Sequence, residues 1–393
     1  MFDILFVNHL KLGSASSYRQ AGFAKYLRET GNKSSLICRT SNKSIEEKNP
    51  PEKGSIDRID YPQYNDINYW KEPLARRFFS NVRSFSNISK VNKIVHANRA
   101  NPYTATIISA ARSSNYKLVV DMEDWDGFGG YSSYTKNYNA KGVVLSVYED
   151  LFPRTADLVV VVSQLLRDLM IRAGVPSNKI LLVPNGFEPS IFNPKVSGKE
   201  AREKYRLFDN PVVIYSSTFW KFEKWNHEVA LGAFRKIQKS VPEVRFLLVG
   251  SGNVAMQSMI EQYGLEKNAV ATGFVPREEV PQLMAAADVA MHVISRHGFH
   301  AASSPMIISE YMAVGKAIVA PRVGELANLL GGEEGFLVEE PDSELLADGV
   351  VKLLKNDALR KEMGARAASK ALSDYSYSVL AKKLEKSYND LLN

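Results

Sequence analysis

Cysteine is almost absent from this chain of 393 residues, in which Cys38 stands alone. A single thiol excludes a disulfide within the chain and a zinc site built from several cysteines. Long apolar runs are lacking too, since no segment approaches the roughly 18 apolar residues that a membrane span needs. The amino terminus, MFDILFVNHLKLG, has a short apolar run and an acidic Asp3, so we expect a first strand rather than a secretory signal. These absences favour a reducing, cytoplasmic compartment.

Acidic residues are fewer than basic ones. The chain has 43 Asp and Glu against 50 Lys and Arg, which leaves a net charge of +7 and a pI near 9.1. Such a field favours an anionic partner, for which a nucleotide, a phospholipid surface and nucleic acid all qualify. The hydrophobic content of 45% supplies a core for each of about two domains.

Strands and helices alternate along the first half. Apolar residues at 4–7, a helical pattern at 17–30 and a second apolar run at 34–38 predict the opening of a parallel doubly wound α/β sheet. Gly13 follows the first strand, where a glycine lets the backbone approach a ligand closely. Residues 41–68 are polar and contain prolines, which predicts a loop or irregular structure.

Residues 71–93 predict a basic amphipathic helix, with Leu74, Phe78, Val82 and Phe85 at helical spacing. Such a helix can lie in an anionic membrane interface, or it can dock its apolar stripe on the domain core, which is the commoner use. The arginines off the apolar stripe, or at its boundary, are Arg76, Arg77 and Arg83.

Four carboxylates follow the predicted strand 117–120, namely Asp121, Glu123, Asp124 and Asp126. In open α/β sheets ligands bind at the carboxyl ends of the strands. Clustered carboxylates there can bind a metal, raise one another's pKa or act as a general base, or they can simply cap an acidic turn. We favour the functional interpretation because of the position at the edge.

Two further segments of the first half predict irregular structure. Residues 127–142 are rich in glycine and tyrosine without a clear period, which predicts a mobile loop beside the acidic turn. Residues 188–211 carry prolines and many charges, which predicts a linker to a second domain.

The alternation of strands and helices restarts at 212–215. In the loop that we expect at 216–225, Lys221 and Lys224 would face the carboxyl edge of the second sheet. A lysine there can stabilise a leaving phosphate or can simply be solvated. Further along, the sequence from Gly250 to Ala255 nearly matches the G-x-G-x-x-G/A fingerprint, so an NAD-dependent oxidoreductase is a competing prediction.

The stretch GFHAASSPMIISEYMAVGKAIVAP, at 298–321, predicts a loop, a helix, a turn and a buried strand. We expect Ser304 as the N-cap, Pro305 as the first helical residue and Gly315 as the stop. The helix start would then hold an anion such as a diphosphate. Glu310, further along, would accept hydrogen bonds from two neighbouring hydroxyls, as on a ribose.

Three histidines stand near these predicted edges. His297 and His300 flank Gly298, but no third ligand has a spacing that suits a metal, so we expect none there. His96 ends a predicted strand and can either touch a ligand or pack in the core.

Two motifs resemble the retaining GT-B glycosyltransferases of the family-four group, which includes mannosyl- and glucosyltransferases acting on lipid and polysaccharide acceptors. Residues 163–194 resemble the inter-domain signature of that family, and 304–316 resemble its donor helix, usually SP-x-K-x-x-EYMA-x-GK. The resemblance implies two Rossmann-like domains facing a cleft. It divides the chain into an acceptor-binding domain (1–188), a nucleotide-sugar-binding domain (189–375) and a last helix (376–393) that crosses back onto the first.

The implied chemistry is transfer of a sugar from a UDP- or GDP-linked donor to a lipid-linked or glycan acceptor. It needs no metal or other cofactor and no nucleic acid, and it suits a cytoplasmic protein with an optional peripheral contact to the inner face of the cell membrane. The predicted catalytic residues are Asp124, Glu123 and Lys224. The predicted nucleotide-sugar site comprises Gly13, Lys221, Lys224, Gly250, Gly273, Phe274, Val275, Ser304, Pro305, Met306, Ile307 and Glu310.

The sequence departs from the family pattern at several of these positions. Ala302 stands where the first of two family glutamates is usual, and Ile307 replaces the lysine of the donor helix. No arginine lies near Phe219, and Glu123 or Asp124 takes the place of a histidine near the reacting sugar. A degenerate transferase kept as a partner subunit is therefore an alternative.

Overall fold

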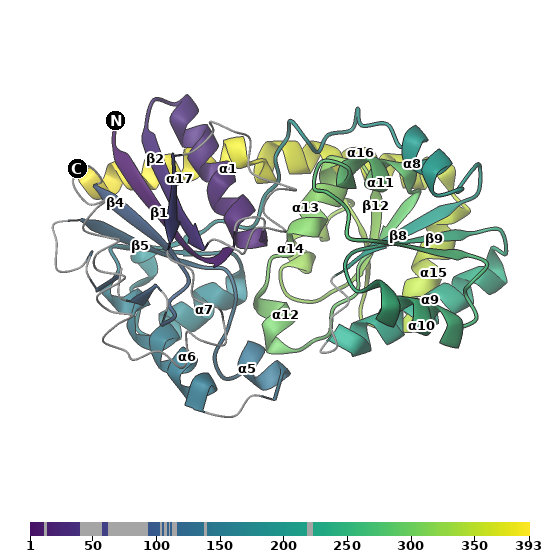
Figure 1. Ribbon diagram of the computed structural model, residues 1–393, viewed down its shortest axis with the longest axis horizontal. Helices are drawn as coiled ribbons and strands as arrows, with labels where there is room; N and C mark the ends of the chain where they lie inside the picture. The colour runs from purple at the N-terminus through teal and green to yellow at the C-terminus, as the bar shows by residue number, and fades with distance from the viewer. Residues whose placement is uncertain are drawn as a thin grey trace. The chain divides into compact units, whose positions relative to one another are not determined.

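The computed structural model describes residues 1–11, 14–39, 57–61, 93–102, 104–105, 108–109, 111, 116–136, 140–217 and 223–393. Its contacts divide the chain into two compact units, each a sheet flanked by helices (Figure 1). Unit 1 comprises Met1–Pro184 and Tyr377–Asn393, and unit 2 comprises Asn185–Ser376. The sequence predicted domain boundaries after residues 188 and 375, whereas the units of the structure meet after Pro184 and Ser376.

Unit 1 is built on a parallel sheet with the order β3-β2-β1-β4-β5-β6-β7 among the described residues. The order reverses at β1, where Ile4 pairs with Ser34 on one side and with Ile94 on the other. Such a switch point is where open α/β sheets bind ligands. The strands are β1 (Asp3–Lys11), β2 (Lys33–Arg39), β3 (Asp57–Tyr61), β4 (Ile94–Asn98), β5 (Lys117–Met122), β6 (Leu158–Val161) and β7 (Ile180–Leu182).

The last helix of the chain packs within unit 1. Helix α17 (Tyr377–Leu392) lies against α1 (Ala15–Glu29), and the aromatic ring of Tyr377 covers Gly22. A Cβ at Gly22 would come within 2.4 Å of that ring, so this close approach requires glycine. Further described helices of this unit are α5 (Tyr131–Tyr134), α6 (Ala140–Leu151) and α7 (Gln164–Arg172).

Unit 2 is a second parallel sheet, with the order β10-β9-β8-β11-β12-β13. Counted from β8, this is the 3-2-1-4-5-6 order of a Rossmann fold. Its strands are β8 (Val212–Ser216), β9 (Arg245–Val249), β10 (Ala269–Gly273), β11 (Val289–Met291), β12 (Ala317–Pro321) and β13 (Phe336–Val338). Its helices are α8 (Lys199–Lys204), α9 (Lys224–Ser240), α10 (Asn253–Gln262), α11 (Val280–Ala286), α12 (Gly298–Ala302), α13 (Met306–Ala313), α14 (Leu326–Leu330), α15 (Ser343–Leu354) and α16 (Asp357–Lys370).

Some segments predicted as irregular contain regular structure. Strand β3 lies inside 41–68, and α5 with the start of α6 lies inside 127–142, so the loop predictions were wrong there. Strand β3 has the sequence DRIDY, whose single aliphatic residue, Ile59, carries too weak a pattern to predict a strand. Helix α12 likewise replaces part of the small-residue loop predicted before α13.

The segment 188–211 is not a free linker. Phe192 and Leu207 are fully buried in the core of unit 2, and α8 lies between them. The linker prediction rested on the charges and prolines of this segment and missed its few buried apolar side chains. Among the described helices, none combines the length and the apolar character required to cross a membrane.

Candidate functional site

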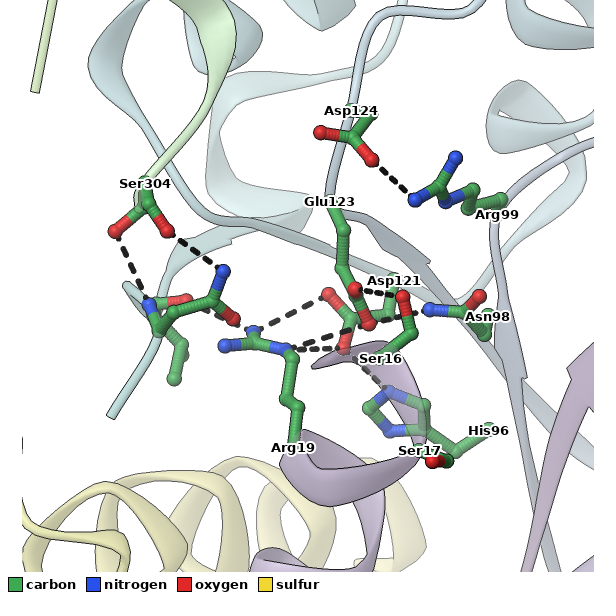
Figure 2. Close-up of polar contacts among 12 residues, drawn as sticks. Ser16, Ser17, Arg19, His96, Asn98, Arg99, Asp121, Glu123, Asp124 and Ser304 are labelled. Atoms are coloured by element: carbon green, nitrogen blue, oxygen red, sulfur yellow. Dashed lines mark hydrogen bonds and ion pairs between the residues drawn. The ribbon is translucent and has the colours of Figure 1, made fainter. Parts of the chain in front are cut away.

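Helix α13 starts one residue later than was predicted. Pro305 occupies the cap position without a side-chain hydrogen bond, and the helix begins at Met306. The side chain of Ser304 is engaged elsewhere, because its Oγ accepts a hydrogen bond from the backbone N–H of Asn185 (3.2 Å; Figure 2). The side-chain amide of Asn185 also donates to the carbonyl of Ser304 at 2.7 Å. The predicted capping role was therefore wrong, and Ser304 binds Asn185 instead.

Tyr311 fixes α13 against the end of β8. Its hydroxyl donates to Ser216 Oγ at 2.9 Å and accepts from the Ser216 backbone N–H at 3.1 Å. Because α13 runs into strand β12, its first turn lies at the carboxyl edge of the sheet, where a ligand is expected. The predicted stop is confirmed, since Gly315 follows the last turn with φ +75°.

Glu310 is buried in α13, with 2% of its surface exposed. Burial raises the pKa of its carboxyl, against the opposing effect of Arg277, with which it forms an ion pair. The Arg277 guanidinium also lies 4.7 Å from the centre of the Phe192 ring. Arg277 was not predicted as a site residue, because the pairing depends on the tertiary contact between α13 and the segment after β10.

The glycines predicted for this site join two strand ends. Gly250 follows β9, and its N–H donates to the carbonyl of Gly273, at the end of β10, at 3.2 Å. Gly273 has φ +73°, which favours glycine there. Beyond it the side chain of Phe274 is exposed, while Val275 packs partly on the core of unit 2.

Lys224 was predicted to lie in a loop, but it is the first residue of α9. Its side chain is 70% exposed, with Nζ 3.4 Å from Glu228 Oε1. The first turn of α9 carries little apolar signal, so the sequence pattern did not separate it from the preceding loop. Among the other predicted site residues, Gly13, Lys221, Arg76, Arg77 and Arg83 lie outside the described residues.

The acidic residues after β5 do not act as one cluster. Asp121 is fully buried, with Arg19 Nε at 2.9 Å and His96 Nε2 at 3.2 Å (Figure 2). Burial acts to raise the pKa of Asp121, but Arg19 and His96 hold it below its usual value. His96 also bonds to the Tyr388 hydroxyl of α17 at 2.5 Å, so it packs in the core. Asp121 therefore has a structural role.

Arg19 extends this buried network to the end of unit 1. It donates hydrogen bonds to the carbonyls of Val183 and Pro184, both at 2.8 Å. The arginine thus joins α1, β5 and the segment after β7, which come from distant parts of the sequence. No local pattern in the sequence singled it out.

Glu123 and Asp124 point into different surroundings. Glu123 is 5% exposed and accepts hydrogen bonds from Ser16 Oγ, at 2.5 Å, and from the side-chain amide of Asn98. Asp124 has a side chain that is 22% exposed and forms an ion pair with Arg99. Of the two predicted catalytic carboxylates, Asp124 is therefore the more accessible.

Burial and the nearby charge of Asp121 raise the pKa of Glu123 to about 7. Between the ordinary carboxyl pKa of 4.5 and this value, the folded chain holds a proton that the unfolded chain releases. Glu123 therefore contributes stability at low pH that is lost as the pH rises through about 7.

We expect the melting temperature of the parent protein to fall when the pH is raised from about 5 to about 8. The fall should be several degrees larger in the parent than in Glu123→Gln. A loss of about 1 kcal/mol lowers the melting temperature of a domain of this size by about 2–4 °C. Calorimetry at both pH values measures this difference. Glu29→Gln, at an exposed position, should behave like the parent. Equal pH dependence in parent and Glu123→Gln would contradict the raised pKa.

The histidines before α13 bind side chains of the protein. His300 Nδ1 bonds to Ser295 Oγ at 2.8 Å, and its Nε2 lies 3.3 Å from Glu223. His297 accepts the backbone N–H of Phe299 at the start of α12. Within the described ranges, no three histidine, cysteine or acidic side chains gather as metal ligands.

The sequence family described as Glycosyl transferases group 1 matches residues 198–370, and the one described as Glycosyltransferase Family 4 matches residues 21–191. The chain belongs to the group 1 glycosyltransferases. The predicted GT-B class, an α/β fold with two Rossmann-like domains, is confirmed for this group 1 glycosyltransferase.

Relatives of this group 1 glycosyltransferase include the GDP-mannose-dependent alpha-(1-6)-phosphatidylinositol monomannoside mannosyltransferase of Mycolicibacterium smegmatis. The two are 28% identical over 235 residues, which is 58% of this chain and 61% of that protein. The N-acetyl-alpha-D-glucosaminyl L-malate synthase of Bacillus anthracis is 24% identical over 241 residues, or 60% of each chain. The chain thus spans about three fifths of the length of each of these two relatives.

Solved structures resemble this group 1 glycosyltransferase over nearly its whole length. Sucrose-phosphate synthase from Thermosynechococcus elongatus has a TM-score of 0.79 and 19% identity, covering 100% of this chain and 99% of the other. Anabaena HepE in complex with UDP-glucose has a TM-score of 0.77 and 19% identity, covering 99% and 100%. At this identity the likeness shows the fold.

Proposed function

We propose that the protein is a retaining glycosyltransferase, which moves a sugar from a UDP- or GDP-linked donor to a lipid-linked, glycan or other acceptor. The observation that carries the proposal is the carboxylate of Glu310, buried in a helix whose first turn lies at the carboxyl edge of the unit 2 sheet. Support comes from relatives whose names include a GDP-mannose-dependent mannosyltransferase, and from a structural neighbour that binds UDP-glucose.

In this proposal unit 2 holds the donor. The start of α13 and the start of α9 both lack a side-chain cap hydrogen bond, and both have positive dipole ends suited to a diphosphate. Lys224 adds a cation at the start of α9. Glu310 accepts hydrogen bonds from the two ribose hydroxyls, which then replace part of its interaction with Arg277.

The transfer step needs little from the protein beyond charge and position. The acceptor oxygen bonds to the anomeric carbon on the face from which the diphosphate departs, so the configuration is retained. The bond between that carbon and the diphosphate oxygen breaks, and the leaving diphosphate takes the acceptor proton. Lys224 and the start of α13 stabilise the departing charge, and Asp124 orients the acceptor. The proposal includes no metal or other cofactor.

The position of the glycine motif argues against a nicotinamide enzyme. Residues Gly250 to Ala255 follow β9, which is the second strand in the Rossmann order of unit 2. The dinucleotide fingerprint belongs after the first strand of that order, which here is β8. An oxidoreductase therefore has little support.

A non-catalytic partner subunit is the second candidate. Ala302 is fully buried, and Ile307 packs against the core of unit 2, so neither position offers the polar group usual in the family. Such a subunit would have the fold and the donor helix of the family but would not catalyse sugar transfer.

A thermal-shift screen of the purified chain against nucleotide sugars tests the donor proposal. A UDP- or GDP-sugar at about a hundred times its Kd should raise the melting temperature by roughly 5–10 °C, since such binding adds about 2.7 kcal/mol. Release of UDP or GDP with an acceptor extract then separates the enzyme from the subunit. Stabilisation by NAD and by no nucleotide sugar would overturn the proposal.

A further inference from the structure

Helix α6 is apolar on the side that faces away from the core. Its inward face buries Gly142, Leu145 and Glu149. Its outward face carries Val143, Val147 and Leu151, which are 50%, 45% and 49% exposed. These three side chains are spaced by four residues and so form one line along the helix. An ordinary surface helix has the opposite pattern, with polar residues facing water.

Neighbouring elements of unit 1 carry two more exposed apolar side chains. Phe128, before α5, and Ile171, on α7, are each 39% exposed. Five of the twelve large hydrophobic side chains exposed among the described residues thus lie between positions 128 and 171. Figure 1 shows α6 and α7 together on the same side of unit 1. Scattered single residues need no explanation, but a cluster of this kind marks an interaction site.

A groove of about 400 Å³ separates α6 from α7. Its lining is mixed, with apolar side chains that include Trp125 and Phe128 and with the charged side chains of Arg154 and Arg172. Both arginines are exposed, and neither has an ion-pair partner among the residues that the structure describes. Asp150 lies on the same lining.

Glu149 also lines the groove, but its carboxylate is turned inward. It accepts the backbone N–H groups of Asp126, at 2.6 Å, and of Gly127, at 2.7 Å. The groove therefore presents two free guanidinium groups against one outward carboxylate. This balance favours an anionic, partly apolar ligand.

We propose that the α6–α7 face of unit 1 docks on an anionic lipid surface. Val143, Val147 and Leu151 enter the boundary between headgroups and acyl chains, and Arg154 and Arg172 bind lipid phosphate. Lipid is favoured over a second copy of the chain by charge, because a two-fold contact through this face would bring like arginines together. The net charge of +7 acts in the same direction.

Vesicle co-sedimentation of the full chain tests this docking face, with phosphatidylcholine alone or mixed with phosphatidylglycerol. We expect binding to the mixed vesicles, and a loss of at least about tenfold in Val143→Glu/Val147→Glu, since each valine gains by leaving water. Arg154→Ala/Arg172→Ala should lose binding mainly on the anionic vesicles. The matched control is Val254→Glu, at an 87% exposed valine of unit 2, which should bind as the parent does.

Two results would overturn the proposal. One is undiminished vesicle binding by the double valine variant, including the case in which only Arg76→Glu/Arg77→Glu/Arg83→Glu loses it, which would assign the contact to residues 71–93. The other is a parent dimer that Val143→Glu/Val147→Glu converts to monomers without any vesicle binding. Nucleotide-sugar stabilisation should persist in all these variants, so a failure here is distinct from a failure of the donor proposal.

Discussion

Replacing Glu310 with alanine is expected to lower kcat/KM for the nucleotide-sugar donor by about a hundredfold to ten-thousandfold. The carboxylate is 2% exposed and is proposed to accept two hydroxyl donors. Hydrogen bonds to a charged group contribute about 1.5–3 kcal/mol each, and about 1.4 kcal/mol corresponds to a tenfold change. Donor binding and initial rates of nucleotide release measure the effect.

The stability of the Glu310 variants separates a functional carboxylate from a structural one. Burial raises the pKa of Glu310, so its charged form costs stability once the pH exceeds the raised value. Glu310→Gln should therefore be at least as stable as the parent at neutral pH, while donor binding is weakened. Glu266→Ala, at an exposed position of the same unit, is the control and should change neither property.

Two outcomes would count against this role for Glu310. Full turnover in Glu310→Ala would place the donor elsewhere. A large loss of stability in Glu310→Gln, with donor affinity unchanged in the folded fraction, would mean that the ion pair with Arg277 is structural.

Replacing Lys224 with alanine is expected to lower kcat by about a hundredfold to a thousandfold, the range found when one group stabilising transition-state charge is removed. KM should change less, because the charge on the diphosphate grows as the bond breaks. Lys224→Arg retains the cation and should recover part of the rate. Steady-state kinetics with a saturating acceptor provide the measurement.

The position of Lys224 makes a stability control available within the same helix. A cation at the first residue of α9 opposes the helix dipole, so Lys224→Ala should be as stable as the parent or slightly more stable. Lys239→Ala, in the last turn of α9, removes a cation that favours the helix and should leave kcat unchanged. Equal rates for Lys224→Ala and the parent would remove the lysine from the mechanism.

The α/β class followed from local patterns, because buried strands such as 158–161 are continuous apolar runs. The stop of α13 at Gly315 followed in the same way, since a left-handed residue after a helix is a local requirement. Strand β3 and the buried residues inside 188–211 could not be predicted in this way. Their apolar residues are too few to form a local pattern, and their burial depends on tertiary packing.

The roles of the site residues were less accessible from the sequence. A serine before a proline predicts a helix cap, yet Ser304 bonds to Asn185, which lies 119 positions earlier. A row of acids predicts one functional cluster, yet Arg19, 102 positions from Asp121, withdraws that carboxylate into the core. In each case a hydrogen bond to a residue far away in the sequence replaces the local interaction that the sequence predicted.

The sequence by itself determined the alternation of strands and helices, the existence of a donor-type helix and the family. Only the tertiary structure decided that Glu310 pairs with Arg277, that Glu123 is more buried than Asp124, and that α6 turns Val143 and Val147 outward. The physical reason is range. Backbone conformation and hydrophobic periodicity are set within a few residues, whereas burial, charge pairing and pKa depend on contacts between residues far apart in the chain.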